Sequence, residues 1–191
     1  EVVGFDMAEV SIDGVSMAQS AVEAATGADV VITMLPNGQI LRTVANEIIP
    51  AMAAGSALVD CSTVDVDSAK AVAQQAENAG LLSVDAPVSG GVGGAAGGTL
   101  TFMAGGSTDA FAKAEPLFDI MGQKAVHCGD AGAGRLVLDG TEVGSAPSSA
   151  YSQPDRPVTA HAPANNSAAP RSHGIPPRND MPRPYWHDDA I

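Results

Sequence analysis

The chain has 191 residues, of which 45% are hydrophobic and only 4% aromatic, and its formal net charge is −13. This length accommodates one domain, or one domain with a tail, around a core of aliphatic side chains. The negative charge argues against nucleic acids and anionic membrane surfaces as partners, because basic groups supply most of that affinity. No apolar run reaches the roughly 20 residues of a transmembrane helix, and no secretory signal is visible.

The first part of the chain alternates short apolar runs with segments of helical periodicity. Residues 1–6 form a predicted strand that ends at Asp6, and Ser20 with Glu23 forms a capping box for a short helix closed by Gly27. Further strands are expected at residues 29–35, 56–63, 81–87, 99–106 and 124–129, and helices at 38–55, 66–80 and 107–122. This alternation is typical of crossover connections in a parallel sheet, so the predicted fold class is α/β and doubly wound.

The segment from Val84 to Gly106 contains eight glycines between two apolar stretches. It is expected to be a loop whose backbone comes close to a ligand, the alternative being a flexible linker. The composition then changes near Gly134. Residues 1–134 contain 16 acidic and 4 basic side chains, whereas residues 135–191 contain 6 and 5 together with nine of the 13 prolines. We therefore predict a folded domain at 1–134 and a disordered, Pro/Ser/Ala-rich tail at 135–191.

Polar or glycine-rich tips follow several predicted strands, at the edge where ligands bind in open α/β sheets. Asp6 is placed to accept ribose hydroxyls of a dinucleotide, or merely to cap the next turn. Leu35, Pro36 and Asn37 form a rigid turn at another strand end, where we expect backbone to pass along a cofactor. Thr63 either lines a nicotinamide pocket or serves as a turn or N-cap residue, a role for which Asp65 competes.

The stretch Ser89, Gly90 and Gly91 combines a hydroxyl with two unhindered backbone N–H groups, a combination that suits a carboxylate. His127 fits a packed strand-end residue better than a general base. The two cysteines, Cys61 and Cys128, are interpreted as unpaired thiols in a reducing compartment, and no spacing predicts a metal site.

Five motifs in order carry a more specific signal: DVVITMLP, LVDCSTVD, DAPVSGGVGGA, GTLTFMAGG and VHCGDAGAG. Together they closely resemble the 3-hydroxyisobutyrate dehydrogenases of the β-hydroxyacid dehydrogenase family, over residues 1 to about 134. The form of the glycine-rich motif looks more like this branch than like the tartronate semialdehyde reductases, which remain an alternative.

The resemblance implies NAD-dependent oxidation of 3-hydroxyisobutyrate to methylmalonate semialdehyde in valine breakdown, with a small 3-hydroxyacid as the partner. It places Asp6, Leu35, Pro36 and Thr63 on the NAD contacts, and the 89–91 stretch on the substrate. Family members of full length are expected to be homo-oligomers, located in the cytoplasm or, in eukaryotes, in the mitochondrial matrix.

The chain also departs from the family pattern. The family's glycine-rich dinucleotide fingerprint and first βαβ unit are not found, so the Rossmann-type, mostly parallel sheet is expected to be incomplete. No lysine follows Lys124, so the family's catalytic lysine has no counterpart, and the family's helical second domain is replaced by the tail. We therefore expect a fragment that is itself inactive, or alternatively a non-catalytic remnant that serves as a cofactor-binding module.

Overall fold

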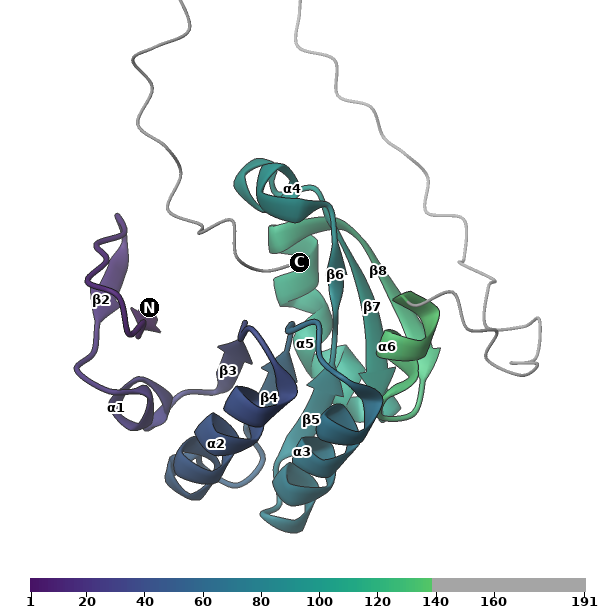
Figure 1. The fold of residues 1–191 in the computed structure, drawn as a ribbon, viewed down its shortest axis with the longest axis horizontal. Coiled ribbons are helices and arrows are strands. Elements are labelled where there is room, and N and C mark those ends of the chain that lie inside the picture. The colour runs from purple at the N-terminus through teal and green to yellow at the C-terminus, as the bar shows by residue number, and fades with distance from the viewer. Residues whose placement is uncertain (139–191) are drawn as a thin grey trace, which may run out of the picture. The chain divides into compact units, whose positions relative to one another are not determined.

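The computed structural model describes residues 1–138, and the rest of the predicted tail lies outside these residues. Its main feature is a six-stranded sheet with helices on both faces (Figure 1). The strands are β3 (Val30–Thr33), β4 (Ala57–Asp60), β5 (Leu82–Asp85), β6 (Val88–Ser89), β7 (Leu100–Gly106) and β8 (Gly122–Gly129). The predicted α/β class is confirmed.

Four of the six helices in residues 1–138, the first three and the fifth, begin at a residue whose side chain caps the helix. The six helices are α1 (Ala21–Ala25), α2 (Gly38–Ile48), α3 (Val66–Asn78), α4 (Gly91–Gly97), α5 (Thr108–Met121) and α6 (Ala133–Leu138). Half of the expected capping box of α1 is present: Ser20 Oγ accepts from the Glu23 amide at 3.1 Å, whereas Glu23 Oε2 accepts from the Gln19 amide at 2.8 Å rather than from the Ser20 amide. Helix α2 ends at Ile48 and gives way to a 3₁₀ turn, Ile49–Ala51, because Pro50 cannot continue the hydrogen-bond ladder.

Two apolar clusters hold these layers together, one on each face of the sheet. The first joins α1, α2 and α3 to the sheet through Leu41, Ile48, Leu58, Val72 and others. The second lies under α5 and is dominated by Phe102 and Phe118, whose rings stack with their centroids 4.6 Å apart. Aliphatic side chains and alanines fill the remainder, as the low aromatic content predicts.

The first three strands of the main sheet are parallel, with α2 and α3 as their crossover connections. β3 pairs with β4, and β4 with β5, in a continuous register that aligns their carboxyl ends. This part of the sheet therefore has the predicted parallel arrangement with helical crossovers, and it places three strand ends along one edge.

The glycine-rich segment differs from the prediction. It is not an open loop throughout: β6 leads directly into α4, and Gly98 closes that helix in the left-handed region at φ 62°. β7 then returns antiparallel to both β5 and β6, while β8 pairs parallel with β7 after the α5 crossover. A connection this short permits an antiparallel return where a parallel crossover would need a dozen or more residues.

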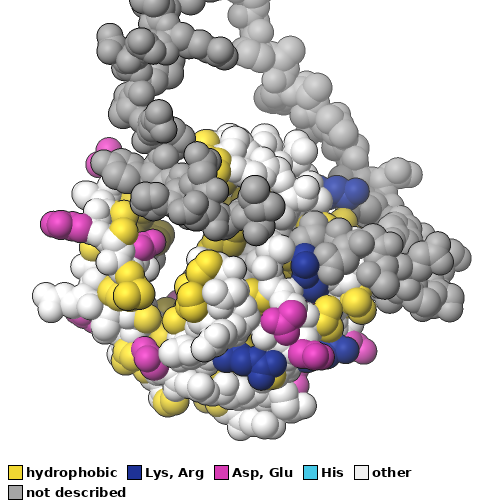
Figure 2. Space-filling view, in the orientation of Figure 1, with side chains coloured by type: hydrophobic (Ala, Val, Ile, Leu, Met, Phe, Trp, Pro, Cys, Tyr) yellow, Lys and Arg dark blue, Asp and Glu magenta, His cyan; other side chains and the backbone are white. Residues whose placement is uncertain are grey.

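The N-terminal region also differs. β1 (Val2–Gly4) pairs in parallel with β2 (Val15–Met17), a strand the sequence pattern did not predict, and the two form a separate sheet. Of the thirteen large exposed hydrophobic side chains among residues 1–138, ten lie within residues 1–40, and Figure 2 shows yellow side chains on the surface at the left of the view. β1 is therefore not part of the main sheet, contrary to the expectation that Asp6 would follow one of its strands.

Beyond β8 the chain turns into α6, which runs from Ala133 to Leu138. Regular structure thus continues four residues past the boundary predicted at Gly134. None of the helices within residues 1–138 is long and apolar enough to cross a bilayer.

Candidate functional site

Three polar side chains form a row across the carboxyl ends of the parallel strands. Thr33 at the end of β3 is in register with Asp60 at the end of β4, and Asp60 is in register with Asp85 at the end of β5. Residues in register on neighbouring strands point to the same face, which here is the α2/α3 face. All three are buried, although the other residues of these strands are mostly apolar.

Asp60 connects two turns at this edge. Its Oδ1 atom accepts hydrogen bonds from Thr33 Oγ1 at 2.7 Å, Ser62 Oγ at 2.6 Å and the Ser62 amide at 3.2 Å. Ser62 Oγ in turn accepts from the amide of Leu35 at 2.8 Å. The turn after β3 and the turn after β4 are therefore joined through one carboxylate oxygen.

The environment of Asp60 opposes its ionisation. Burial raises the pKa of this carboxyl above its usual range, and the hydrogen bonds from Ser62 and Thr33 only partly offset that effect. The second carboxylate oxygen, Oδ2, has no hydrogen-bond partner within the described residues. A buried carboxylate held in this way is costly, so its position needs a reason other than packing.

Asp85 holds the start of α6. Its Oδ1 atom accepts from the Gly132 amide at 2.5 Å, one residue before the helix. Burial raises the pKa of Asp85 to about 6, against the hydrogen bonds from the Gly132 and Arg135 backbones, and the nearby charge of Asp60 raises it further.

Two glycines make this contact possible. A Cβ on Gly105 would lie 2.6 Å from Asp85 Oδ1, and a Cβ on Gly134 would overlap the Met103 carbonyl oxygen. Both contacts are closer than almost any that real Cβ atoms make. The two glycines therefore allow β5, β7 and α6 to approach around the buried carboxyl.

The predicted cofactor residues of the main sheet lie at the same edge. Leu35 is half-buried and Pro36 exposed in the turn after β3, and Thr63 is exposed after β4. The alternative role for Thr63 as an N-cap is excluded, because Asp65 caps α3 by accepting from the Ser68 amide at 2.8 Å. The Thr63 hydroxyl makes no hydrogen bond within residues 1–138, so it is available to a ligand such as a nicotinamide.

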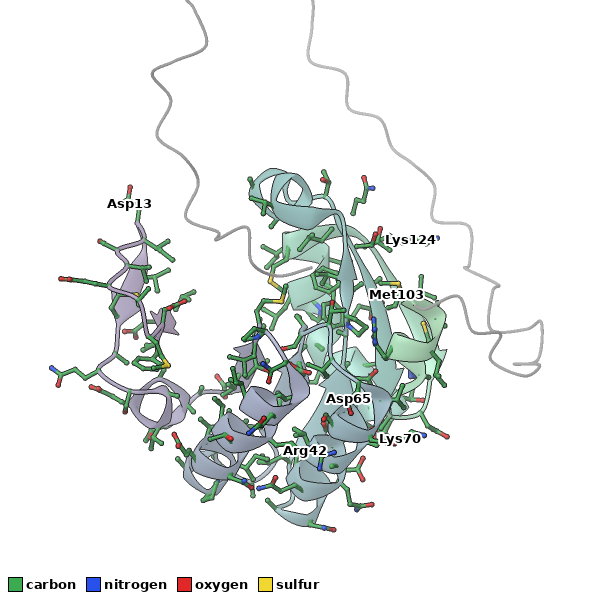
Figure 3. The ribbon with its side chains drawn as sticks, in the orientation of Figure 1. Asp13, Arg42, Asp65, Lys70, Met103 and Lys124 are labelled. Atoms are coloured by element: carbon green, nitrogen blue, oxygen red, sulfur yellow. The ribbon has the colours of Figure 1, made fainter. Side chains whose placement is uncertain are left out.

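Hydrogen bonds and a nearby positive charge stabilise the ionised form of Asp65 at the N-terminus of α3. The hydrogen bonds from Ser68 lower the pKa of Asp65, with a smaller contribution from the charge of Arg42. Arg42 donates from Nε to Ser68 Oγ at 3.1 Å, and Figure 3 shows Arg42 and Asp65 at the neighbouring helices α2 and α3. These contacts fix the two helices that follow the site turns.

Asp6 lies after β1, outside the main sheet, and its side chain is exposed. Its Oδ1 atom accepts from the Ala8 amide at 2.8 Å, so it does cap the next turn, as the simpler interpretation proposed. Its other oxygen remains able to accept a ribose hydroxyl. The structure does not bring Asp6 into the row of strand ends.

The predicted substrate residues form the junction between β6 and α4. Ser89 pairs with Thr101 on β7, and its exposed hydroxyl makes no hydrogen bond within the described part of the chain. Gly90 and Gly91 are exposed and adopt φ values of 133° and 58°, which L side chains rarely occupy. Bare, accessible backbone beside a serine hydroxyl is therefore present, as the motif predicted.

The other candidates are occupied by structural contacts. His127 stacks on Phe111 with ring centroids 4.8 Å apart, and its Nε2 lies 2.7 Å from the Gly106 carbonyl oxygen, which fits the packed residue we expected. Both cysteines are unpaired; Cys61 is buried, with its pKa raised to about 12 mainly by burial, whereas Cys128 is only half-buried. Within residues 1–138, no group of three or more His, Cys, Asp or Glu side chains could hold a metal ion.

Sequence reasoning missed the roles of Asp60, Ser62 and Asp85, although all three lie inside motifs it had singled out. A signal was available. An aspartate that closes a wholly apolar strand is buried when the strand is central, and a buried carboxylate requires donors nearby.

The site fits one end of a dinucleotide better than the other. Exposed Pro36, the unused Thr63 hydroxyl and the nearby backbone suit a nicotinamide and its ribose. The described residues contain no strand-to-helix turn with the G-x-G-x-x-G spacing that cradles a pyrophosphate.

Comparison with known proteins identifies a nicotinamide-cofactor domain. Residues 4–129 match the family model for the NAD binding domain of 6-phosphogluconate dehydrogenase. A probable 3-hydroxyisobutyrate dehydrogenase from Mycobacterium tuberculosis is 44% identical over 137 residues, which cover 69% of this chain and 47% of that protein. An NAD-dependent L-serine dehydrogenase from Pseudomonas aeruginosa is 43% identical over 140 residues, with the same coverage.

A solved structure of a 3-hydroxyisobutyrate dehydrogenase also has a similar fold. The M. tuberculosis 3-hydroxyisobutyrate dehydrogenase with L-serine superposes with a TM-score of 0.64 at 45% identity, covering 65% of this chain and 43% of the other. The chain thus spans about half the length of the relatives it matches. Because the family model covers more than half of the chain, the chain belongs to the family of the NAD binding domain of 6-phosphogluconate dehydrogenase, with 3-hydroxyisobutyrate dehydrogenases among its relatives.

Proposed function

We propose that the chain is the cofactor-binding part of an oxidoreductase that transfers a hydride between NAD and a small 3-hydroxy carboxylate. The observation that supports this most directly is the gathering of the Leu35–Pro36 turn and the Thr63 turn at one sheet edge. Bound NAD would supply the hydride acceptor. The location we propose is the cytoplasm, or the mitochondrial matrix in a eukaryote.

In this proposal the chain's own residues position the cofactor. The Leu35–Pro36 backbone passes along the nicotinamide ribose, and the Thr63 hydroxyl donates to or accepts from the nicotinamide group. Asp6 accepts the hydroxyls of the adenosine ribose through its exposed carboxylate, and that negative charge would repel the additional phosphate of NADP.

The substrate would be held at the β6–α4 junction. The Ser89 hydroxyl and the backbone N–H groups of Gly90 and Gly91 suit the carboxylate and hydroxyl of the substrate. 3-Hydroxyisobutyrate is the first candidate, because the motif and the relatives agree. L-serine has the same 3-hydroxy carboxylate framework, and it is named with two relatives.

We propose further that this chain binds the cofactor without turning substrate over. The sequence contains no lysine after Lys124, and His127 is engaged with the Gly106 carbonyl oxygen, so no general base is evident among residues 1–138.

The test is a fluorescence titration of the chain with NADH, using Asp6→Asn and a matched control, Asp13→Asn. Asp13 is also exposed, in the connection between β1 and β2 (Figure 3). We expect saturable binding below about 1 mM, weakened about tenfold by Asp6→Asn and unchanged by Asp13→Asn. Absence of saturable NADH binding, or equal effects of the two substitutions, would refute the proposal for the cofactor.

A further inference from the structure

We propose that Asp60 is a positioning residue of the cofactor edge, whose buried carboxylate fixes the β3–α2 turn against the β4–α3 turn. This inference deepens the proposed function and rests on it for the identity of the ligand. The turns themselves, and the hydrogen bonds that join them, are features of the structure.

The connection runs in one direction through three residues. The amide of Leu35 donates to Ser62 Oγ at 2.8 Å, and that hydroxyl donates its only proton to Asp60 Oδ1 at 2.6 Å. Leu35 and Ser62 are 27 residues apart in sequence, so no local turn accounts for the contact. Because the hydroxyl must point its proton at the carboxylate, its lone pair is left facing the Leu35 amide.

Two further donors fix the carboxylate itself. Thr33 Oγ1 donates to the same Oδ1 atom at 2.7 Å from the end of β3, and the Ser62 amide donates at 3.2 Å. The oxygen therefore receives three donors from two strand ends. Its side chain is only 5% exposed, so these bonds are made away from water.

Packing alone does not explain this carboxylate. Burial raises the pKa of Asp60, and its Oδ2 atom has no partner within the described residues. Removing this carboxylate from water therefore lowers the stability of the folded state. The turn at the opposite end of β4 is closed without a carboxylate. Ser56, equally buried, donates its hydroxyl to the Ala53 carbonyl oxygen at 2.7 Å.

The consequence lies at the surface of the site. We call the connection from the Leu35 amide through Ser62 Oγ to Asp60 Oδ1 the tether. Pro36 directly follows Leu35, and Thr63 directly follows Ser62. Both of these neighbours are exposed. Loss of the tether would release the two turns independently, so that a ligand contacting both would have to order them on binding.

The experiment compares Asp60→Ala, Asp60→Asn and Ser62→Ala with the matched control Ser56→Ala. Amide hydrogen exchange at Leu35, measured by NMR, reports the tether without any ligand. We expect exchange to accelerate about tenfold in Ser62→Ala and Asp60→Ala relative to Ser56→Ala. Asp60→Asn should stay close to the wild-type rate, because its amide oxygen still accepts.

NADH titration of the same variants connects the tether to function. The dissociation constant should rise about tenfold in Ser62→Ala, while Asp60→Asn and Ser56→Ala remain near the wild type. Ser62→Ala keeps the test decisive if Asp60→Ala does not fold. Unchanged Leu35 exchange in Ser62→Ala, or equal NADH affinity in Ser62→Ala and Ser56→Ala, would overturn the inference. A wild-type chain that does not bind NADH would instead refute the proposed function, and the exchange rates would still decide whether Asp60 joins the turns.

Discussion

The buried carboxyl of Asp85 should make the stability of this protein fall as the pH rises through the acid range. Its pKa is raised from 3.8 to about 6, mainly by burial. The folded state therefore holds a proton that the unfolded state has already released between about pH 4 and pH 6. Stability that is present below the unfolded pKa is lost as the pH passes the folded pKa.

The expected size follows from the shift. A difference of about 2 pKa units corresponds to about 3 kcal/mol in the free energy of unfolding. Asp60 acts in the same direction, because burial raises its pKa as well. Substituting Asp85→Asn separates the two, since a neutral amide keeps an acceptor for the Gly132 amide and does not titrate.

The assay is urea unfolding followed by far-ultraviolet circular dichroism, from about pH 4 to about pH 7.5. Asp85→Asn should match the wild type at the acid end and exceed its stability by up to about 3 kcal/mol at neutral pH. Asp119→Asn, which changes an exposed carboxylate on α5 instead, should leave the decline in place. A wild-type stability that rises from pH 4 to pH 6, or a decline undiminished in Asp85→Asn, would refute the reasoning.

Three other substitutions test the packing around the site. Gly134→Ala should destabilise the protein by about 2 kcal/mol or more in urea unfolding, because its Cβ would overlap the Met103 carbonyl oxygen. Phe118→Ala removes a ring stacked on Phe102 and should lower the free energy of unfolding by about 3–5 kcal/mol. Asp65→Ala removes the N-cap of α3 and should cost about 1 kcal/mol, whereas Asp65→Asn, which can still cap, should cost less; equal losses would contradict the capping role.

The parallel half of the sheet was predictable because each element carries its own signals. β3 and β4 are continuous apolar runs, α3 has an amphipathic period, and the caps at Ser20 and Asp65 lie where helices begin. These are local features of short stretches, and hydrophobic burial of the same residues supports the same structure. The parallel alternation of these elements then placed the strand ends at one edge.

The glycine-rich stretch was not predictable in the same way. Helix propensity argues against a helix at Gly91–Gly97, with four glycines in seven residues. α4 forms because β6 and β7 are already paired on either side of it, and Gly90 supplies a backbone conformation that other residues avoid. The antiparallel return of β7 likewise depends on pairing between distant residues, which no local pattern records.

The site was predictable only for residues exposed at the strand ends. Thr63 and Ser89 are exposed, and their hydroxyls make no hydrogen bond with another residue of 1–138; their predicted roles remain predictions. Asp6 was expected at the edge of the same sheet, but β1 pairs with β2 instead. The supporting residues Asp60 and Asp85 were overlooked because sequence motifs do not distinguish a residue that meets a ligand from one that holds the residue that does.

The two aspartates contribute to the site in complementary ways. Each closes a mostly apolar strand in the middle of a sheet, where an apolar residue would be less costly to bury. Asp60 accepts from Ser62 after its own strand and from Thr33 at the end of β3, whereas Asp85 accepts from the amide of Gly132, after β8 and before α6. A fold that accepts two such desolvation penalties side by side gains fixed positions for the loops that surround the strand ends. The carboxylates are therefore best explained by the positions they fix for the segments they bind, since their effect on stability at neutral pH is unfavourable.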